Sequence, residues 1–277
     1  MKIVTMKIGN REFDTANKTY IMGILNVTPD SFSDGGKYDS PDKALFRAEQ
    51  MIREGADMID IGGESTRPGY TPLCAEEEIA RVVPVIEAVK REFDIPVSLD
   101  TSKASVAQAG ILAGADMIND IWGLKKDAEM AKVIAGADVA CCLMHNRTEP
   151  VYGDFFGDVI ADLEQSLELA CEAGINGDKI MIDPGIGFAK SYEQNVEMIA
   201  SLDKLHSFGL PILLATSRKS VIGLTLDLPK EERLEGTLAT SVIGVMKGCS
   251  FLRVHDVKEN VRAVKMALAI RNMNLQR

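Results

Sequence analysis

Residues 58–67 read Met-Ile-Asp-Ile-Gly-Gly-Glu-Ser-Thr-Arg, and this stretch decides how the chain is expected to fold. A short apolar run leads through two glycines to a dense group of polar side chains. Seven other apolar runs also end in polar residues, and the eight polar ends in chain order are Asn26, 64–67, Asp100, Asn119, His145, Asp183, 217–219 and 253–255. Because a parallel strand buried on both faces is a nearly continuous apolar run, the pattern predicts eight such strands with polar carboxyl ends.

Eight parallel strands that alternate with helices close into an α/β fold, the (β/α)8 TIM barrel, whose active site lies at the carboxyl ends of the strands. The apolar runs place the strands near 20–25, 58–61, 96–99, 117–119, 139–143, 180–182, 211–214 and 251–254. An open doubly wound sheet is the alternative, and the count of eight runs favours the barrel. No linker divides the chain, so residues 1–277 are expected to form a single domain.

The sequence also indicates where turns lie and where several helices begin or end. Residues 1–19 contain Gly9-Asn10, a favourable turn, and are expected to form a short N-terminal hairpin that closes the bottom of the barrel. A helix is expected to start at Ser40-Pro41-Asp42, and another at Glu76-Glu77-Glu78. The triplet Gly-Ala-Asp recurs at 55–57, 114–116 and 136–138, where glycine suits the left-handed residue that follows a helix.

The composition argues against several classes of protein. With 31 basic and 41 acidic residues, the formal net charge is −10, which disfavours nucleic acid or an anionic membrane as a partner. No apolar run approaches the roughly 20 residues that a membrane span needs, and the N-terminus lacks a signal-peptide apolar region. The expectation is therefore a cytoplasmic protein that acts on small molecules. Its cysteines are expected to be buried thiols of a reducing compartment, and they are Cys74, Cys141, Cys142, Cys171 and Cys249.

Two carboxylates and an amide follow three of the buried runs. An ionised carboxylate in such a place is costly unless it is paired or hydrogen-bonded. Together, Asp100, Asn119 and Asp183 would suit a flat heterocycle rich in N–H donors, because the amide supplies both a donor and an acceptor. Each acid alone is equally well explained as a cap for the helix or turn that follows. The presence of all three on separate strands favours a binding site.

Several basic residues also lie at the predicted strand ends or in the loops that follow them. Arg253 and His255 fall on one face of an extended segment, and Lys219 lies at a strand-to-helix junction where anions are favoured. Arg67 belongs to the same group, although surface charge explains a loop arginine well. The loop 26–36 is rich in oxygen atoms, and Asn26 at its start suits a magnesium ion whose other ligands are phosphate oxygens and water. A hydrophilic turn is the alternative interpretation of this loop.

These motifs together resemble dihydropteroate synthase over roughly residues 20–271. The segments that carry the resemblance are 22–36, 60–69, 98–101, 118–120, 143–145, 183–188, 217–220 and 253–256, of which the first two are long and specific. The resemblance implies that the chain joins 6-hydroxymethyl-7,8-dihydropterin diphosphate to 4-aminobenzoate and releases diphosphate. It further implies Mg2+ as cofactor and a homodimer as the assembly.

The resemblance also assigns roles to residues. The pterin site would consist of Asp100, Asn119, Asp183, Lys219 and Arg253. The diphosphate site would consist of Asn26, Thr66, Arg67, Arg253 and His255, with Asn26 as the magnesium ligand. The 4-aminobenzoate site would consist of Phe32, Thr66, Pro68, Phe188 and Ser220. Asp34, Arg67 and Lys219 would act at the reacting centre.

Three alternatives remain open on the sequence alone. A pterin-binding methyltransferase domain on the same fold would share Asp100, Asn119 and Asp183 without needing the patch at 217–220. A phosphosugar barrel would use Lys219 as a Schiff base, with Arg218 lowering its pKa. A pterin-binding protein without catalytic activity would tolerate the loss of Asp34 or Arg67, and both are present.

Overall fold

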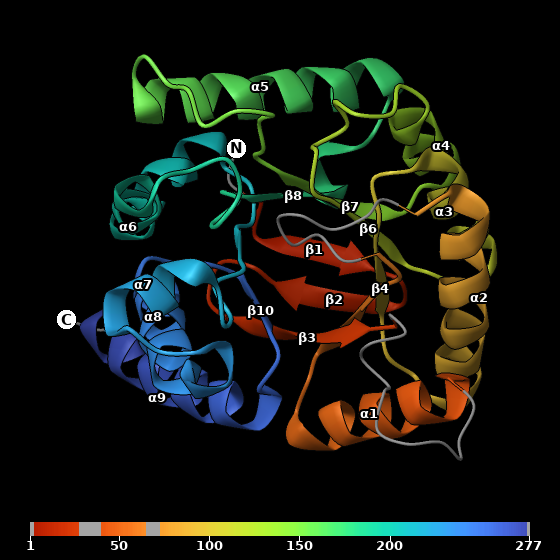
Figure 1. Ribbon diagram of the computed structural model, residues 1–277, viewed down its shortest axis with the longest axis horizontal. Helices are drawn as coiled ribbons and strands as arrows, with labels where there is room; N and C mark the ends of the chain where they lie inside the picture. The colour runs from red at the N-terminus through yellow and green to blue at the C-terminus, as the bar shows by residue number, and fades with distance from the viewer. Residues whose placement is uncertain (1–2, 28–39, 65–72, 276–277) are drawn as a thin grey trace.

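The computed structural model describes residues 3–27, 40–64 and 73–275. Eight parallel strands form one sheet in the order β8-β7-β6-β5-β4-β3-β10-β9, and a parallel bridge between Ile182 and Ile212 joins the two outer strands. The sheet therefore closes into the predicted barrel, which helices encircle in Figure 1. Its strands are β3 (Tyr20–Asn26), β4 (Met58–Gly62), β5 (Val97–Asp100), β6 (Met117–Asp120), β7 (Ala140–Met144), β8 (Ile180–Asp183), β9 (Leu213–Leu214) and β10 (Phe251–Val254).

All eight predicted strands are confirmed, with differences at their ends. The largest difference is at 211–214, where β9 keeps only two residues. Pro211 has no N–H to donate to a neighbouring strand, and its carbonyl instead accepts from Ile182 N at 3.0 Å. Ile212 forms the bridge that closes the barrel, so this segment still serves as the eighth strand position.

Helices cover the outer face of the barrel because the outward-facing strand residues are apolar. Ile59, Leu99 and Ile118 belong to one large core with helix side chains such as Val82 and Ile134. The helices are α1 (Ser40–Glu54), α2 (Ala75–Glu92), α3 (Ala104–Leu112), α4 (Met130–Ala137), α5 (Phe155–Ala173), α6 (Tyr192–Ala200), α7 (Ser220–Leu226), α8 (Leu234–Met246) and α9 (Val257–Leu275), with short 3-10 turns at Gly177–Lys179, Leu202–Phe208 and Lys230–Glu232. None of the helices in the described part of the chain is long and apolar enough to cross a membrane.

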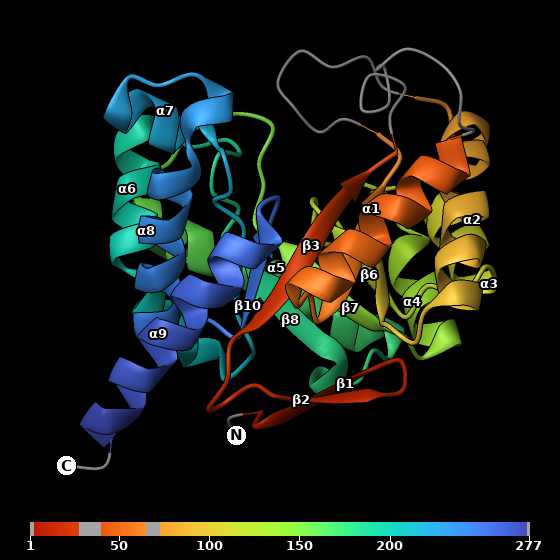
Figure 2. The ribbon, with the colours of Figure 1, turned by 90° about the horizontal axis from the view of Figure 1, so that it is seen from below.

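The bottom of the barrel is filled by side chains from alternate strand positions and by the N-terminal hairpin. Strands β1 (Thr5–Ile8) and β2 (Arg11–Asp14) pair antiparallel around Gly9-Asn10, as predicted. The hairpin lies at the end of the barrel from which β3 points away (Figure 2). Its apolar side chains join those of the barrel interior in a second core, formed by Met6, Ile8, Phe13, Met22, Met58, Met117, Ala140, Cys142, Met181, Leu213 and Phe251. The amino-terminal end of the barrel is thus sealed, and only the carboxyl-terminal end is left for chemistry.

Two expectations about local structure are wrong in part. Gly55 and Gly114 adopt positive φ after their helices, but Gly136 lies inside α4, and Asp138 takes the left-handed conformation instead with φ of 51°. An aspartate tolerates that conformation because its short polar side chain can bond locally. Of the cysteines, Cys74 and Cys171 are exposed rather than buried, because Cys74 is the N-cap residue before α2 and Cys171 lies on the solvent face of α5.

Candidate active site

The interior of the barrel changes from apolar to polar over two residues along β4, β6, β8 and β10. Side chains two apart on a strand share a face. Asp60, Asn119, Asp183 and Arg253 therefore stand directly above Met58, Met117, Met181 and Phe251, which fill the bottom. Asp100 pairs with Asn119 in the β5–β6 register and lies at the same level. The predicted convergence of these acids, the amide and the arginine at one end of the barrel is confirmed.

Arg253 forms the centre of this level and is held by two carboxylates. Its Nε donates to Asp60 Oδ2 at 2.6 Å, and its Nη2 donates to Asp100 Oδ2 at 2.7 Å. Burial opposes the charged form, but the charges of Asp60 and Asp100 outweigh it and raise the pKa of Arg253. Burial raises the pKa of Asp100 to about 7, while Arg253 acts in the opposite direction. The guanidinium is therefore fixed in orientation by groups from two other strands.

Two acceptor atoms at this level have no hydrogen-bond partner among the described residues. They are Asp60 Oδ1 and Asp100 Oδ1, and both are buried. A buried polar atom without a partner costs free energy, so these two carboxylate oxygens are suited to accept from ligand N–H groups. Asn119 Nδ2 lies 3.5 Å from Asp60 Oδ2, which orients the amide of Asn119 at the same level.

Asp183 and Lys219 form the opposite side of the site. Asp183 Oδ1 accepts from Gly185 N at 2.7 Å, and burial raises the pKa of its carboxyl against the attraction of Lys219. Lys219 Nζ donates to Ile186 O and lies 4.7 Å from the centre of the Phe188 ring. Burial lowers the pKa of Lys219 to about 8, with Arg253 adding to the effect. The ammonium is thus placed between the acid of β8 and an aromatic side chain.

Arg218 does not have the effect on Lys219 that the Schiff-base alternative required. Its Nε donates to Asp256 Oδ2 at 3.0 Å, so this guanidinium is engaged in an ion pair. The charge that lowers the pKa of Lys219 comes instead from Arg253. That expectation was wrong because side-chain direction, not nearness in sequence, decides which cation faces the lysine.

His255 and Asn26 lie at the rim on the remaining side. Ser217 Oγ accepts from His255 N at 3.1 Å and lies 2.9 Å from His255 Nδ1, so the serine fixes the imidazole ring. Asn26 ends β3, and a Cβ built on Gly62 would lie 3.8 Å from both Asn26 Oδ1 and Asp100 Oδ2. The glycine therefore leaves room between the amide oxygen of Asn26 and the Asp100 carboxylate. Ser220 is exposed as the first residue of α7.

Five predicted site residues lie outside the described residues, namely Phe32, Asp34, Thr66, Arg67 and Pro68. Two residues that sequence reasoning did not assign belong beside the site. Asp60 was taken as part of an apolar run, although its spacing from Met58 equals that of Asn119 from Met117. Lys190 bonds to the loop after β8, and no pattern in the sequence indicated this.

Comparison with known proteins gives the family. The pterin binding enzyme family matches residues 22–255. The dihydropteroate synthase of Clostridium beijerinckii is 59% identical over 262 residues, which cover 94% of this chain and 97% of that protein. The chain belongs to the dihydropteroate synthase family of pterin-binding enzymes. As a member of this family, it is a transferase.

Solved structures of this family have the same fold. The dihydropteroate synthase of Clostridium difficile, determined in the presence of pteroic acid, is 50% identical and superposes with a TM-score of 0.91 over 93% of this chain and 98% of that chain. The enzyme of Xanthomonas albilineans, determined with 4-aminobenzoic acid, is 39% identical and has a TM-score of 0.93 over 98% and 99% of the two chains. Relatives of this name span nearly the whole chain, which favours a dihydropteroate synthase over the methyltransferase alternative.

The donor atoms of this dihydropteroate synthase family member fit magnesium only in part. No group of three His, Cys, Asp or Glu side chains in the described ranges could hold a metal ion by itself. Asn26 supplies one amide oxygen at the end of β3. Magnesium commonly keeps several waters and takes the rest of its ligands from substrate phosphates, so a single protein oxygen beside a diphosphate site is compatible with it.

Proposed function

We propose that this chain condenses 6-hydroxymethyl-7,8-dihydropterin diphosphate with 4-aminobenzoate to give 7,8-dihydropteroate and diphosphate. The observation that carries the proposal is the group formed by the buried Asp100, Asn119 and Asp183 and the partly buried Arg253 at one end of the barrel. The pteroic acid and 4-aminobenzoic acid found with the two related structures support it, because they represent the product and the second substrate.

The pterin ring binds to the polar level of the barrel. Its N–H groups donate to the buried oxygens of Asp100 and Asp183, and Asn119 contributes a donor and an acceptor. Arg253 packs its planar guanidinium on the ring while its charge faces the diphosphate, a combination that lysine does not provide. Because Asp60 and Asp100 already hold Arg253, little rotational freedom is lost when the substrate binds.

The reaction needs no protein nucleophile. The amine nitrogen of 4-aminobenzoate attacks the pterin methylene carbon, the bond from that carbon to the diphosphate oxygen breaks, and the amine loses a proton to water. Positive charge that develops on the methylene is stabilised by the carboxylates of Asp100 and Asp183. Arg253, His255 and Asn26 bind the departing diphosphate, and Thr66 and Arg67 are proposed to join them. Mg2+ held by Asn26 and diphosphate oxygens would neutralise charge on the leaving group.

The second substrate lies on the Lys219 side of the site. Phe188 provides an apolar wall, Lys219 Nζ lies beside its ring, and Ser220 stands at the mouth. Phe32, Thr66 and Pro68 complete this proposed pocket, and Asp34 and Arg67 are proposed to act at the reacting centre together with Lys219. These five assignments rest on the family resemblance of residues 22–36 and 60–69.

We also infer a single cytoplasmic domain over residues 1–277 that forms a homodimer. Support for the homodimer comes from large apolar side chains exposed on the neighbouring helices α7, α8 and α9, which are Leu224, Ile243, Met246, Met266, Ile270 and Met273. Sedimentation analysis tests the assembly, and a monomer across the micromolar range would contradict it.

The proposed reaction is tested by incubating the purified chain with both substrates and Mg2+ and measuring dihydropteroate by chromatography. We expect product with the wild type and almost none with Asp183→Asn. Asp116→Asn is the matched control, because Asp116 is a partly buried acid that bonds Lys90 Nζ and Val97 N at the opposite end of the barrel. Absence of product with the wild type, or full activity of Asp183→Asn, would contradict the proposal.

A further inference from the structure

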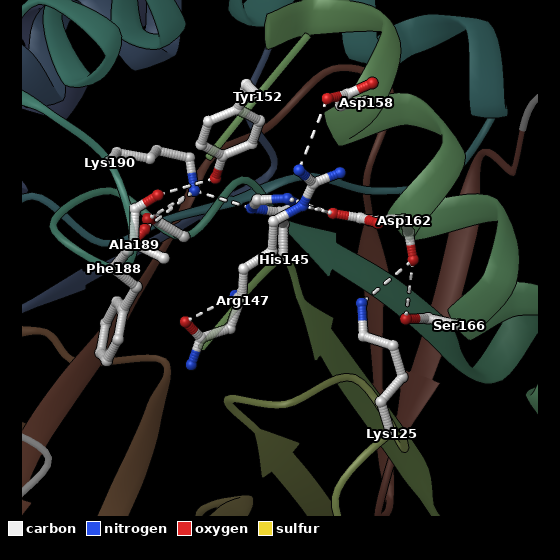
Figure 3. A network of polar contacts seen from close by, with 12 residues as sticks. Lys125, His145, Arg147, Tyr152, Asp158, Asp162, Ser166, Phe188, Ala189 and Lys190 are labelled. Atoms are coloured by element: carbon white, nitrogen blue, oxygen red, sulfur yellow. Dashed lines mark hydrogen bonds and ion pairs between the residues drawn. The ribbon is translucent and has the colours of Figure 1, made fainter. Parts of the chain in front are cut away.

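Lys190 connects the loop after β8 to the barrel through three contacts (Figure 3). Its Nζ lies 2.7 Å from His145 Nδ1, 3.1 Å from Gly185 O and 3.2 Å from Phe188 O. An ammonium group has three N–H donors, and each contact is with an acceptor. The protonated lysine therefore uses its full donor capacity at this place.

His145 is a fixed hydrogen-bond partner that anchors Lys190. The imidazole is fully buried, and burial together with the charge of Lys190 lowers its pKa to about 3, so the ring is neutral. Because Lys190 donates to Nδ1, we assign the ring proton to Nε2, which donates to Asp162 Oδ2 at 3.0 Å. Asp162 on α5 also accepts from Arg147 Nε. The lysine is thus anchored through one histidine to the outer helix layer.

The loop that Lys190 holds contains residues of the proposed site. Gly185 N donates to Asp183 Oδ1, and Lys219 donates to Ile186 O in the same loop. A Cβ on Gly185 would lie 2.0 Å from His145 O, so the loop approaches the end of β7 as closely as only glycine permits. Phe188, whose carbonyl bonds to Lys190, presents its ring to Lys219 at 4.7 Å.

We propose that Lys190 is a positioning residue, which sets the 185–188 loop so that the Phe188 ring faces the second substrate. This inference rests on the proposed function, because Phe188 is assigned to the 4-aminobenzoate pocket. Asp183 accepts from Gly185 N of this loop, but it is held on β8 as Asp100 and Asn119 are held on β5 and β6, whereas Phe188 belongs to the loop itself. The effect should therefore fall on the aromatic amine more than on the pterin.

The charge of Lys190 should be visible in a pH profile. Burial lowers the pKa of Lys190 to about 7, with Lys219 and Arg147 adding to the effect and Asp183 and Asp162 opposing it. A neutral amine has only two N–H donors for the three acceptors, so the loop loses one contact as the pH rises through that value. An arginine stays protonated throughout this range. The Michaelis constant for 4-aminobenzoate should therefore rise more steeply with pH in the wild type than in Lys190→Arg.

The test compares the wild type with Lys190→Met and Lys190→Arg. Methionine keeps most of the side-chain length and removes the donors. Lys90→Met is the matched control, since Lys90 forms a partly buried ion pair with Asp116 at the other end of the barrel. Amide hydrogen exchange of residues 185–189 reports on the loop independently of catalysis. Steady-state kinetics with each substrate varied in turn reports on the pocket.

In Lys190→Met we expect faster exchange in the loop and a Michaelis constant for 4-aminobenzoate raised by about tenfold or more. The Michaelis constant for the pterin substrate should change by less than about threefold in Lys190→Met. The control Lys90→Met should change neither Michaelis constant. Unchanged loop exchange, or an equal effect on both substrates, would overturn the inference. A wild type that forms no dihydropteroate would contradict the proposed function, whereas loop exchange would still decide whether Lys190 holds the loop.

Discussion

Replacement of Asp60 tests the view that Arg253 is oriented by two carboxylates. Asp60 is completely buried, and its Oδ2 accepts from Arg253 Nε at 2.6 Å. In Asp60→Ala, the Nε–H of Arg253 loses its acceptor, and Asp100 and Asp183 still compensate the charge. In Asp60→Asn, the amide oxygen can still accept from Nε, but the hydrogen bond no longer has a charged acceptor.

The expected magnitudes follow from these contacts. Removing one partner of a buried ion pair lowers the free energy of unfolding by roughly 3–5 kcal/mol. Because Asp100 remains at 2.7 Å from Nη2, we expect the lower end of this range, about 3 kcal/mol of unfolding free energy, for Asp60→Ala. For Asp60→Asn we expect about 1 kcal/mol, the difference between a charge-assisted and a neutral hydrogen bond. The less firmly held guanidinium should also bind diphosphate about tenfold more weakly in Asp60→Asn.

Urea unfolding followed by circular dichroism measures the stabilities, and calorimetric titration with diphosphate and Mg2+ measures the affinity. Ser98→Ala is the matched control, because Ser98 pairs with Asp60 in the β4–β5 register and its buried Oγ has no partner among the described residues. Its loss should change stability by less than about 0.5 kcal/mol. If Asp60→Ala unfolds at the same urea concentration as Ser98→Ala, the reasoning about Arg253 is wrong.

Three further outcomes are expected. Asp100→Ala and Asp183→Ala should abolish pterin binding in calorimetry while circular dichroism shows an intact fold, and unchanged affinity in both would refute the pterin assignment. Arg253→Ala should weaken diphosphate more than 4-aminobenzoate, and lysine should not restore diphosphate affinity fully, because it lacks the planar stacking face; equal losses for both ligands would indicate collapse of the site instead. The folded-state pKa of Asp100 is raised from 3.8 to about 7, so its stabilising contribution is complete below 3.8 and is lost as the pH rises through 7. Unfolding free energy should therefore fall over this interval more in the wild type than in Asp100→Asn, and parallel pH profiles would contradict that pKa.

Several features of the fold followed from short-range properties of the chain. The direction of each apolar run placed its polar end at one rim, and this located Asp100, Asn119, Asp183 and Arg253 correctly. The turn at Gly9-Asn10 similarly indicated the hairpin that seals the bottom. These predictions succeeded because the strand-end position and the alternation of faces depend only on neighbouring residues. The short β9 follows from Pro211, which the sequence shows but which the predicted strand at 211–214 did not take into account. The exposed cysteines could not be predicted in this way, because the packing of the helices decides them.

The sequence by itself determined which end of the barrel carries the chemistry and most of the polar residues found there. Only the tertiary structure decided which groups meet. Asp60 and Arg253 are 193 positions apart, and Lys190 and His145 are 45 apart, so no local pattern relates either pair. Closing the barrel brings each pair within hydrogen-bond distance, where burial makes the contact strong and shifts the pKa values of Asp100 and Lys190. The physical reason is that strand polarity is a property of neighbouring residues, whereas charge pairing and desolvation arise only when distant strands pack together.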